Sequence, residues 1–293
     1  MSKLHEKILY YCFGGGLGHI TRFFAFCNTT GIKPVLITAN NKIDKVLLNC
    51  FAKDVFVLPD NLATNKEGLR NWLYEIIKRI SPDRFIVDAF PGGILGELVD
   101  FRELDDIKIE YIARILKLET YNKRLNGRLP KISKIWQVEK FGEEQSIWLK
   151  NLANENKIGI DKLRLDYPDF NNDFSISLPQ DCWLIVHSGS EQEVLELYEY
   201  ASDVAMVENL SPSFVVVGQV SRPEFLPNEI PYYSVYPVTG LLKKASRVIS
   251  GAGFNIIQQM ALMREKHMAL PFERPLDDQT LRLKLIQYKL TNK

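Results

Sequence analysis

One histidine close to the N-terminus follows a run of glycines, in the part of the chain best suited to chemistry. The segment Cys12–Arg22 reads CFGGGLGHITR, with His19 near its end. Its glycines are Gly14, Gly15, Gly16 and Gly18. A loop without side chains lets a ligand approach the backbone, and an imidazole, whose unperturbed pKa is about 6.5, can accept a proton near neutral pH. The segment therefore predicts a ligand-binding loop in which His19 is a candidate general base.

The glycine loop differs from two common nucleotide-binding motifs. His19 stands where the fingerprint G-x-G-x-x-G has its third glycine, and the apolar segment 34–40 ends without the acidic residue that a ribose would need. No Gly-Lys-Ser/Thr follows, so the loop is not a Walker A motif either. A turn that only packs a helix onto a strand remains the alternative interpretation.

A second glycine turn and a polar pair lie near the other end of the chain. The turn is Ser250-Gly251-Ala252-Gly253, and it is followed at 270–279 by LPFERPLDDQ. Within this second stretch, Asp278 and Gln279 set a carboxylate beside a carboxamide, and together these groups can accept and donate hydrogen bonds to sugar hydroxyls. Helix capping by Asp277 or Asp278 is the alternative.

Composition excludes several classes of protein. Lys+Arg is 37 and Asp+Glu is 36 in 293 residues, so no basic surplus suggests a nucleic-acid partner. The four cysteines form no Cys-x-x-Cys pair and mostly lie in apolar runs, as expected for buried free thiols in the cytoplasm. The histidines have no metal-ligand spacing, and we expect no signal peptide and no integral membrane segment. Peripheral membrane contact is left open.

Elements that alternate between strand and helix must position these residues. Apolar segments predict buried strands at 8–13, 34–40, 54–59, 84–88 and 108–114, and helices are predicted at 42–50, 66–80 and 94–104. Such alternation is typical of a doubly wound parallel sheet. A polar stretch follows at 117–180, and the pattern then restarts at 182–187 and continues to a helix predicted at 254–265.

Two domains follow from this restart. The polar segment 166–173 has the composition of a linker, so we expect one Rossmann-like domain at 1–170 and a second at 171–293. The predicted fold class is α/β, with two doubly wound parallel sheets facing each other across a cleft. Ligands of such folds bind beyond the carboxyl ends of the strands, where both glycine turns would lie.

The motifs together resemble the GT-B glycosyltransferases, most closely the MurG-like and macrolide-type branch. The shared features are Gly-Gly-Gly-Leu-Gly-His near the N-terminus, Ser-Gly-Ala-Gly after a late strand, and Pro-Phe followed by Asp-Asp-Gln, in the same order and with similar spacing. The resemblance covers both halves of the chain. It implies an enzyme that moves a sugar from a uridine or thymidine diphosphate donor, bound by the second domain, to an acceptor bound by the first.

The family's site residues can be carried over only where this sequence matches the motifs. His19 matches the histidine that faces the reaction centre, within a loop formed by Gly15, Gly16 and Gly18. The positions matching the loops around the donor phosphates are Ser188, Gly189, Ser190, Gly251, Ala252 and Gly253. Asp278 and Gln279 match the pair that holds the donor sugar, and Tyr236 falls about where the nucleobase pocket lies.

Two departures from the family pattern affect the donor side. Gln259 stands where the family has a glutamate that holds the ribose, and loss of the charge roughly halves the strength of such a hydrogen bond. Only 280–293 follow Gln279, so we expect no C-terminal helix that returns to the first domain and helps to hold the cleft. No Asp-x-Asp motif occurs, so the resemblance implies neither a metal ion nor another cofactor, with backbone N–H groups stabilising the leaving group.

Several other polar residues have more than one interpretation. Asp88 ends an apolar strand and could orient an acceptor or His19, or form a local turn. Arg114 could pair with a phosphate, with Asp88, or within a structural ion pair. Glu97 is expected to be a solvated acid in the first turn of a helix. His187 ends a strand beside the predicted phosphate loop, but a structural role as a buried histidine is expected for it, as it is for His267.

The sequence thus predicts a cytoplasmic, metal-independent and inverting glycosyltransferase of the hexosyltransferase kind, whose partners are a nucleotide sugar and an unidentified acceptor. His19 is the first candidate for the base and Asp88 the second. One alternative is a sugar-nucleotide epimerase or hydrolase, which would need further acids near the anomeric carbon; the candidates are Asp88, Glu97 and Glu273. The other is a non-catalytic nucleotide-sugar-binding protein, which Gln259 and the short C-terminal stretch favour.

Overall fold

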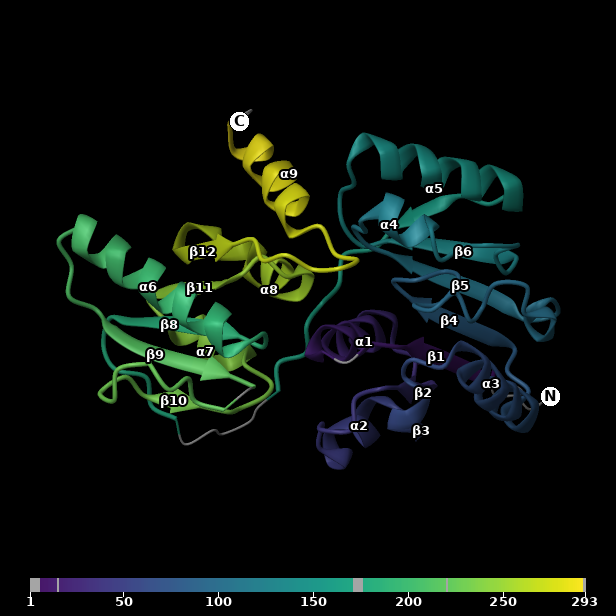
Figure 1. The fold of residues 1–293 in the computed structure, drawn as a ribbon, viewed down its shortest axis with the longest axis horizontal. Coiled ribbons are helices and arrows are strands. Elements are labelled where there is room, and N and C mark those ends of the chain that lie inside the picture. Colours follow the sequence, from purple (N-terminus) through teal and green to yellow (C-terminus); the bar gives the residue numbers. More distant parts are fainter. Residues whose placement is uncertain (1–5, 15, 171–175, 220, 292–293) are drawn as a thin grey trace.

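The first half of the molecule is a seven-stranded parallel sheet covered by helices (Figure 1). The computed structural model describes residues 6–14, 16–170, 176–219 and 221–291. The strands of the first sheet are β1 (Ile8–Cys12), β2 (Val35–Thr38), β3 (Asp54–Val57), β4 (Arg84–Asp88), β5 (Lys108–Ala113), β6 (Ile132–Gln137) and β7 (Ile160–Lys162). The helices around it are α1 (Leu17–Thr30), α2 (Lys45–Phe51), α3 (Lys66–Ile80), α4 (Leu118–Asn122) and α5 (Glu143–Asn156), with short 3-10 turns at Asp60–Leu62 and Arg102–Leu104.

The second half repeats this architecture with a five-stranded parallel sheet. Its strands are β8 (Cys182–His187), β9 (Ser213–Gly218), β10 (Tyr232–Tyr233), β11 (Arg247–Gly251) and β12 (His267–Leu270). Its helices are α6 (Glu191–Val207), α7 (Thr239–Lys244) and α8 (Phe254–Gln259), with 3-10 turns at Met260–Leu262 and Arg264–Lys266. The last helix, α9 (Gln279–Thr291), leaves this half and lies between the two (Figure 1).

Both sheets share one strand order, and this order positions the site. The first runs β3-β2-β1-β4-β5-β6-β7 and the second β10-β9-β8-β11-β12. In each, the winding direction reverses beside the first strand, between β1 and β4 and between β8 and β11. A crevice opens beyond the carboxyl ends of the strands at such a reversal. The predicted α/β class, with two doubly wound parallel sheets, is confirmed.

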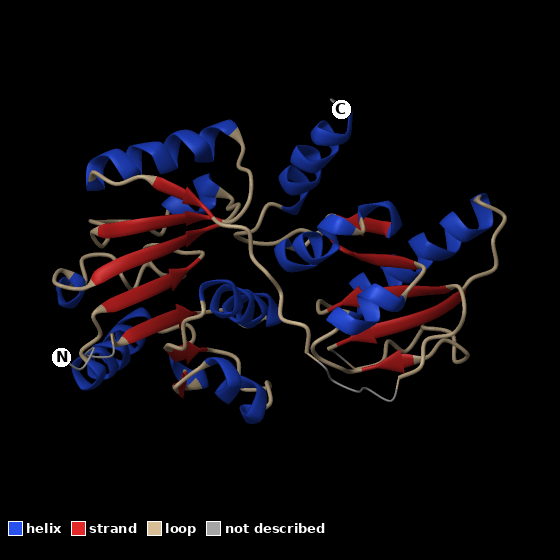
Figure 2. Ribbon diagram, turned by 180° about the vertical axis from the view of Figure 1, so that it is seen from behind, coloured by secondary structure: helices blue, strands red, loops and turns tan. Residues whose placement is uncertain are grey.

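Each sheet is sandwiched between two layers of helices (Figure 2). In β1, Leu9 and Tyr11 pack on the side of α3 and α5, whereas Tyr10 and Cys12 pack on the side of α1 and α2. A strand that is buried on both faces needs no polar alternation, which explains the continuous apolar run in the sequence. In the second half, α6 covers one face of the sheet and α7 the other.

Two predicted helices were wrong in part or in whole, and several elements in one polar stretch were missed. The polar stretch 117–180 contains α5 and the strands β6 and β7, which extend the first sheet; β7 is the edge strand and is half exposed, so its sequence is polar. Residues 94–104 form turns with only a short 3-10 segment, because Gly93 and Gly96 adopt φ of 83° and 76°, which no helix allows. Residues 260–265 form 3-10 turns after α8.

The expectation that no helix returns from the second half to the first was also wrong. Leu281 and Leu285 of α9 pack against the core of the first sheet. Arg282, which is 1% exposed, donates to both carboxylate oxygens of Glu139 at 2.8 and 3.1 Å. The same guanidinium donates to Asp277 and to the Ala252 carbonyl. Because Glu139 follows β6 and Ala252 follows β11, Arg282 ties the two halves together.

The sheets occupy 8–162 and 182–270. The predicted domain boundary between 170 and 171 falls at the edge of 171–175, which lies outside the described residues, so it stays a prediction. No helix within the described ranges has both the length and the apolar character needed to cross a membrane.

Arg282→Met should lower the free energy of unfolding by about 3–5 kcal/mol, because removing one member of a buried ion pair leaves its partner uncompensated. Urea unfolding measures the loss. The control is Lys123→Met, since Lys123 is exposed and pairs with Glu119 one helical turn away; such pairs contribute less than about 1 kcal/mol. Equal losses in the two variants would mean that Arg282 does not stabilise the contact between the halves.

Candidate functional site

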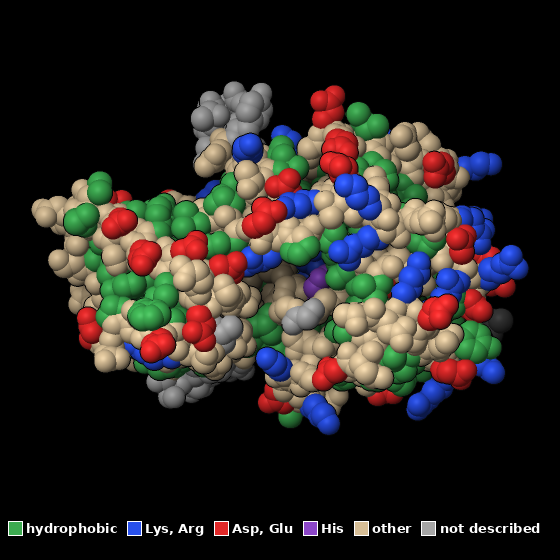
Figure 3. Space-filling model, in the orientation of Figure 1, with side chains coloured by type: hydrophobic (Ala, Val, Ile, Leu, Met, Phe, Trp, Pro, Cys, Tyr) green, Lys and Arg blue, Asp and Glu red, His purple; other side chains and the backbone are tan. Residues whose placement is uncertain are grey.

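A cavity of about 260 Å³ lies between the two halves, at the carboxyl ends of both sheets. Figure 3 shows the corresponding hollow at the centre of the molecule, with a histidine and basic side chains at its border. The ionisable residues that line it are His19, Arg22, Arg114, Tyr167, His187, Tyr236, Arg274 and Asp277. The cleft expected between the two sheets is therefore present and lined by groups from both.

The first half contributes a histidine–aspartate pair. His19 lies in the first turn of α1, and Asp88 ends β4, so the two residues flank the reversal of the first sheet. His19 Nδ1 and Asp88 Oδ2 are 2.6 Å apart. Burial would raise the pKa of Asp88, but Arg22 and then His19 hold it well below its ordinary value. An ionised carboxylate can only accept, so the hydrogen sits on Nδ1 and Nε2 keeps a free lone pair.

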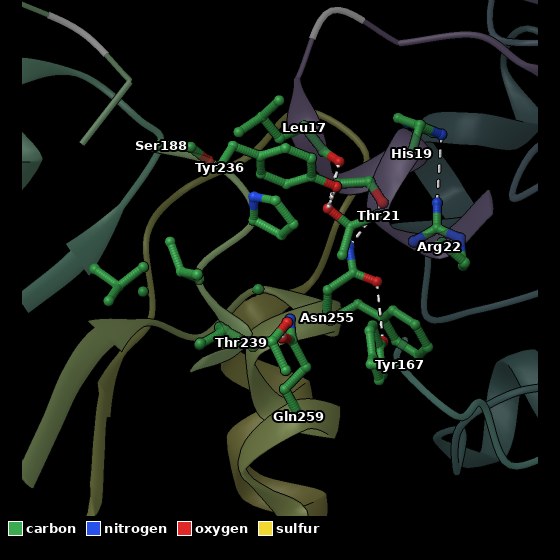
Figure 4. A pocket seen from close by; sticks show the side chains of 18 of the residues that line it. Leu17, His19, Thr21, Arg22, Tyr167, Ser188, Tyr236, Thr239, Asn255 and Gln259 are labelled. Carbon is green, nitrogen blue, oxygen red and sulfur yellow. Dashed lines mark hydrogen bonds between the residues drawn. The ribbon is translucent and has the colours of Figure 1, made fainter. Parts of the chain in front are cut away.

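Arg22 fixes the same carboxylate from the next turn of α1. Its Nε lies 2.5 Å from Asp88 Oδ1 and its Nη2 lies 2.7 Å from Oδ2. Nη2 is also 3.3 Å from His19 Nδ1 (Figure 4), but that nitrogen already carries a hydrogen directed at Asp88, so the ring accepts nothing from Arg22. Burial lowers the pKa of His19 below 6.5, Asp88 acts against this, and Arg22 and Arg114 lower it further. The imidazole is therefore neutral at pH 7.

Gly14 leaves the space that the His19 ring occupies. A Cβ at Gly14 would overlap the ring at Cδ2 and Nε2. A Cβ at Gly16, the residue before α1, would meet nothing within 4 Å, and one at Gly18 would make ordinary contact with Asn255. Gly14 thus makes room for the imidazole, whereas Gly16 and Gly18 leave the backbone of the loop accessible. Gly15, the remaining predicted member of the loop, lies outside the described residues.

The second half contributes another histidine, held in a similar way. His187 ends β8, and its Nε2 lies 2.7 Å from Oε2 of Glu193 on α6. Arg274 donates to both oxygens of the same carboxylate, at 2.5 and 2.7 Å. Burial opposes ionisation of Glu193, but Arg274 and His187 bring its pKa to about 2. His187, which was expected to be only structural, therefore lines the cavity within a charged cluster.

Polar contacts across the cavity join the two halves. Tyr236 Oη lies 3.0 Å from Thr21 Oγ1, and Asn255 donates to the Gly18 carbonyl at 2.7 Å (Figure 4). Tyr167 Oη donates to the side-chain oxygen of Asn255 at 3.0 Å. These contacts hold α1 against α8, so the structure is that of a closed cleft.

Most of the site residues predicted from the sequence meet at this cavity. Those that line it are Gly18, His19, Ser188, Tyr236, Gly251, Gly253, Gln259 and Gln279. Asp88 acts on the cavity through His19. The predicted residues outside the lining are Gly16, Gly189, Ser190, Ala252 and Asp278.

The adjacent acid and amide predicted to hold a sugar point to different partners. Asp278 Oδ1 accepts the backbone N–H of Leu281 at 2.8 Å, which is the capping contact considered from the sequence. Gln279 is 6% exposed and lines the cavity, and its Oε1 accepts the Phe272 N–H at 3.0 Å. Asp277 also lines the cavity, bonded to Arg114 at 2.6 Å. Direct contact of Asp278 or Gln279 with a sugar stays a prediction.

Asp88 was named from the sequence as a residue that could orient His19, but Arg22, Glu193 and Arg274 were not. Arg22 lies three residues after His19, a spacing that puts the two side chains on one helical face, and Ser190 with Glu193 forms the S-x-x-E pattern of a capping box, which the structure contains. No spacing or motif in the sequence connects Arg274 with His187 or Glu193.

Two of the acids considered as catalytic candidates lie elsewhere. Glu97, expected to be solvated, is fully buried and accepts the Tyr11 hydroxyl at 2.5 Å. Glu273 is exposed and pairs with Lys117. His267 contacts Ser250 at 2.8 Å and lies outside the lining. Among the described residues, no three His, Cys, Asp or Glu side chains gather as a metal site would require.

Comparison with known proteins connects the chain to solved structures but not to a sequence family. No family model matches it, and no curated protein is significantly similar to it. The glycotransferase of kitacinnamycin superposes with a TM-score of 0.61 at 13% identity, over 96% of this chain and 84% of that one. The spinosyn forosaminyltransferase SpnP gives 0.59 at 12%, over 97% and 84%.

A sugar-nucleotide epimerase has a similar fold. The UDP-N-acetylglucosamine 2-epimerase from Rickettsia bellii superposes with a TM-score of 0.57 at 13% identity, over 94% of this chain and 81% of that one. At such low identity the likeness extends to the fold alone. The fold of this chain is GT-B, the two-sheet architecture of these glycosyltransferases.

Gly14→Ala should lower the free energy of unfolding by about 1–3 kcal/mol, because its Cβ would push the His19 ring away from Asp88 and overfill the site, and because residues with a side chain rarely adopt the φ of 158° found here. Gly16→Ala is the matched control, since its Cβ would enter open space and should change stability by no more than about 0.5 kcal/mol. Chemical denaturation of both variants measures the difference. If the two alanine variants were equally stable, the absence of a side chain at Gly14 would not be what makes room for the His19 ring.

Proposed function

We propose that this protein transfers a sugar from a nucleoside-diphosphate donor to an acceptor hydroxyl, with His19 as the general base. The observation that carries the proposal is a neutral, aspartate-held imidazole at a cavity between two Rossmann-like sheets. The buried side-chain atoms without a hydrogen-bond partner, within the described residues, are Tyr10 Oη, Arg114 Nε and Ser202 Oγ. Nε2 of His19 is not among them, so it is open to the cavity. The GT-B fold supports the same proposal.

The reaction is a single displacement. The acceptor oxygen attacks the anomeric carbon while its proton moves to His19 Nε2, and the bond to the diphosphate breaks with its electron pair leaving on the phosphate oxygen. The new imidazolium keeps its Nδ1–H directed at Asp88, which stabilises the positive charge. Arg22 keeps Asp88 ionised, so the carboxylate does not compete for the proton. Attack from the face opposite the leaving group inverts the anomeric centre.

The donor is proposed to lie against the second half. Tyr236, Gln259 and Gln279 all line the cavity, where they would contact the nucleobase, the ribose and the sugar in turn. Gln259 Oε1 is 3.2 Å from the Thr239 hydroxyl, so the amide that replaces the family's glutamate is already oriented by a neighbour (Figure 4). We propose uridine or thymidine as the nucleoside from the motif resemblance, and transfer without a metal ion because no Asp-x-Asp pair is present.

The acids near the cavity favour transfer over epimerisation or hydrolysis. These two reactions have to be considered because a sugar-nucleotide epimerase has a similar fold. Those two reactions need carboxyl groups that can exchange protons with the sugar or with water. Asp277 is the one acid in the described lining, and it is held by Arg114 and Arg282. Burial would raise its pKa, but the two arginines bring it to about 2. Asp88 is likewise held in an ion pair by Arg22.

Replacement of His19 by glutamine tests the proposal. Transfer from UDP- and TDP-sugars should fall by about 10²–10⁴-fold, the range for loss of a general base. Stabilisation of the fold by the same donors should persist, with or without EDTA, and amounts to about 2.7 kcal/mol at a ligand concentration 100 times the dissociation constant. His267→Gln, outside the cavity lining, is the control and should keep transfer.

Three outcomes would contradict parts of this proposal. Transfer that survives within a few-fold in His19→Gln would remove His19 as the base. A donor effect that requires Mn²⁺ would contradict metal-independent transfer. Donor binding without turnover in the parent protein would instead favour the non-catalytic alternative.

The pH dependence of turnover gives an independent test. His19 must be neutral to accept the proton, and its pKa lies below 6.5 in the folded protein because the ring is buried. At saturating donor, kcat should therefore be level above the pKa that His19 has in the donor complex and fall by about tenfold per pH unit below it. A kcat that keeps rising between pH 7 and 9 would mean that a different group is the base.

A further inference from the structure

The proposed transfer makes no use of the second imidazole of the cavity. Glu193, whose pKa is about 2, can only accept hydrogen bonds, so the hydrogen of His187 sits on Nε2, 2.7 Å from the carboxylate. The other ring nitrogen, Nδ1, makes no hydrogen bond within the described residues. It is also absent from the buried side-chain atoms that lack a partner there, so it is open to the cavity that His187 lines.

Two glycines make room for this imidazole. A Cβ at Gly189 would overlap the Glu193 carboxylate and His187 Nε2, and one at Gly251 would come within 2.8 Å of Cε1 and 3.0 Å of Nδ1. Neither glycine has a positive φ, so space and not backbone conformation requires glycine at both positions. Gly253, by contrast, borders open space. The turns at the ends of β8 and β11 are thus built around the His187 ring, with room for a ligand beside it.

The arginines of the cavity lining are already neutralised. Arg22 is paired with Asp88, Arg114 with Asp277, and Arg274 with Glu193. An anion that enters the described part of the cavity therefore meets no unpaired guanidinium. Additional positive charge can come only from a proton on an imidazole, because no lysine belongs to this lining. His19 needs a free lone pair on Nε2 for the proposed transfer, which leaves His187.

We propose that His187 binds the diphosphate of the nucleotide sugar through Nδ1 and takes up one proton from solvent when it does so. Glu193 holds the opposite ring nitrogen and balances the charge of the imidazolium, and Arg274 keeps Glu193 ionised. The proton returns to solvent when the diphosphate leaves. The identity of the natural anion rests on the proposed function, whereas the anion site itself does not.

The groups around His187 fix the direction of the pH dependence. Burial lowers the pKa of His187 in the free protein, Glu193 and Glu196 of α6 act to raise it, and Arg274 acts to lower it; β11 presents the uncharged Gly251. A bound diphosphate adds negative charge beside Nδ1 and so raises the pKa. Affinity is then highest below the free-protein pKa and falls by up to about tenfold per pH unit between the free and bound values.

Histidine-labelled full-length protein, titrated by NMR with and without saturating inorganic pyrophosphate, tests the anion site directly. We expect His187 to titrate below pH 6.5 in the free protein and at least one unit higher with pyrophosphate, whereas His267, outside the cavity, should not change. Absence of pyrophosphate binding, or an unchanged His187 titration, would overturn the proposal.

A variant makes the same test through affinity. The ratio of the pyrophosphate dissociation constants of His187→Gln and the parent protein, taken at each pH, cancels the ionisation of pyrophosphate itself. This ratio should rise towards tenfold or more at pH values below the pKa of His187 in the free protein and approach one well above its pKa in the complex, and a ratio that is constant with pH would overturn the proposal. If sugar transfer is intact but the His187 titration does not change with pyrophosphate, only the proposed anion site is disproved. If pyrophosphate raises the pKa of His187 but no nucleotide sugar binds, only the proposed sugar transfer is disproved.

Discussion

One buried carboxylate, that of Asp88, determines the state of the candidate site. It accepts from His19 on one side and from Arg22 on the other, at 2.5 to 2.7 Å. Because Arg22 neutralises it, Asp88 stays ionised although it is buried, and because it is ionised it can only accept, which fixes the hydrogen of His19 on Nδ1. The strand order of the first sheet makes this meeting possible, since β1 and β4 are neighbours although 71 residues of sequence, 13–83, separate them. The availability of Nε2 at the cavity depends on this one interaction.

The second half repeats the arrangement with different residues. His187 and Glu193 take the parts of His19 and Asp88, and Arg274 takes the part of Arg22. Closure of the cleft brings the two clusters to the walls of one cavity, and α9 holds the halves together through Arg282. Both imidazoles are largely buried, and burial is the largest influence that lowers their pKa values. The proposed proton transfer at one wall and the proposed anion binding at the other would therefore take place in the same closed cleft.

The sequence predicted more of the fold than of the site. β1 was predictable because burial on both faces leaves a continuous apolar run, whereas β7 was missed because an exposed edge strand is polar. The helix predicted at 94–104 was wrong, since the positive φ of Gly93 and Gly96 cannot be inferred from a helical spacing of apolar residues. His19 stood out by its place after the glycines. Its neighbour Arg22 was overlooked although the spacing of three residues places both side chains on one helical face. The link of His187 to Arg274 through Glu193 could not be predicted, because ion pairing between distant residues depends on the folded arrangement.

The hydrogen position on His19 is the most direct test of the central claim, that Asp88 holds a neutral imidazole with Nε2 free. Nitrogen chemical shifts of the histidine rings at pH 7 distinguish a protonated from an unprotonated ring nitrogen. The structure predicts one protonated nitrogen, Nδ1, and one unprotonated nitrogen, Nε2, for His19 in the protein without ligand. An imidazolium, or a hydrogen on Nε2, would contradict the assignment of His19 as the base.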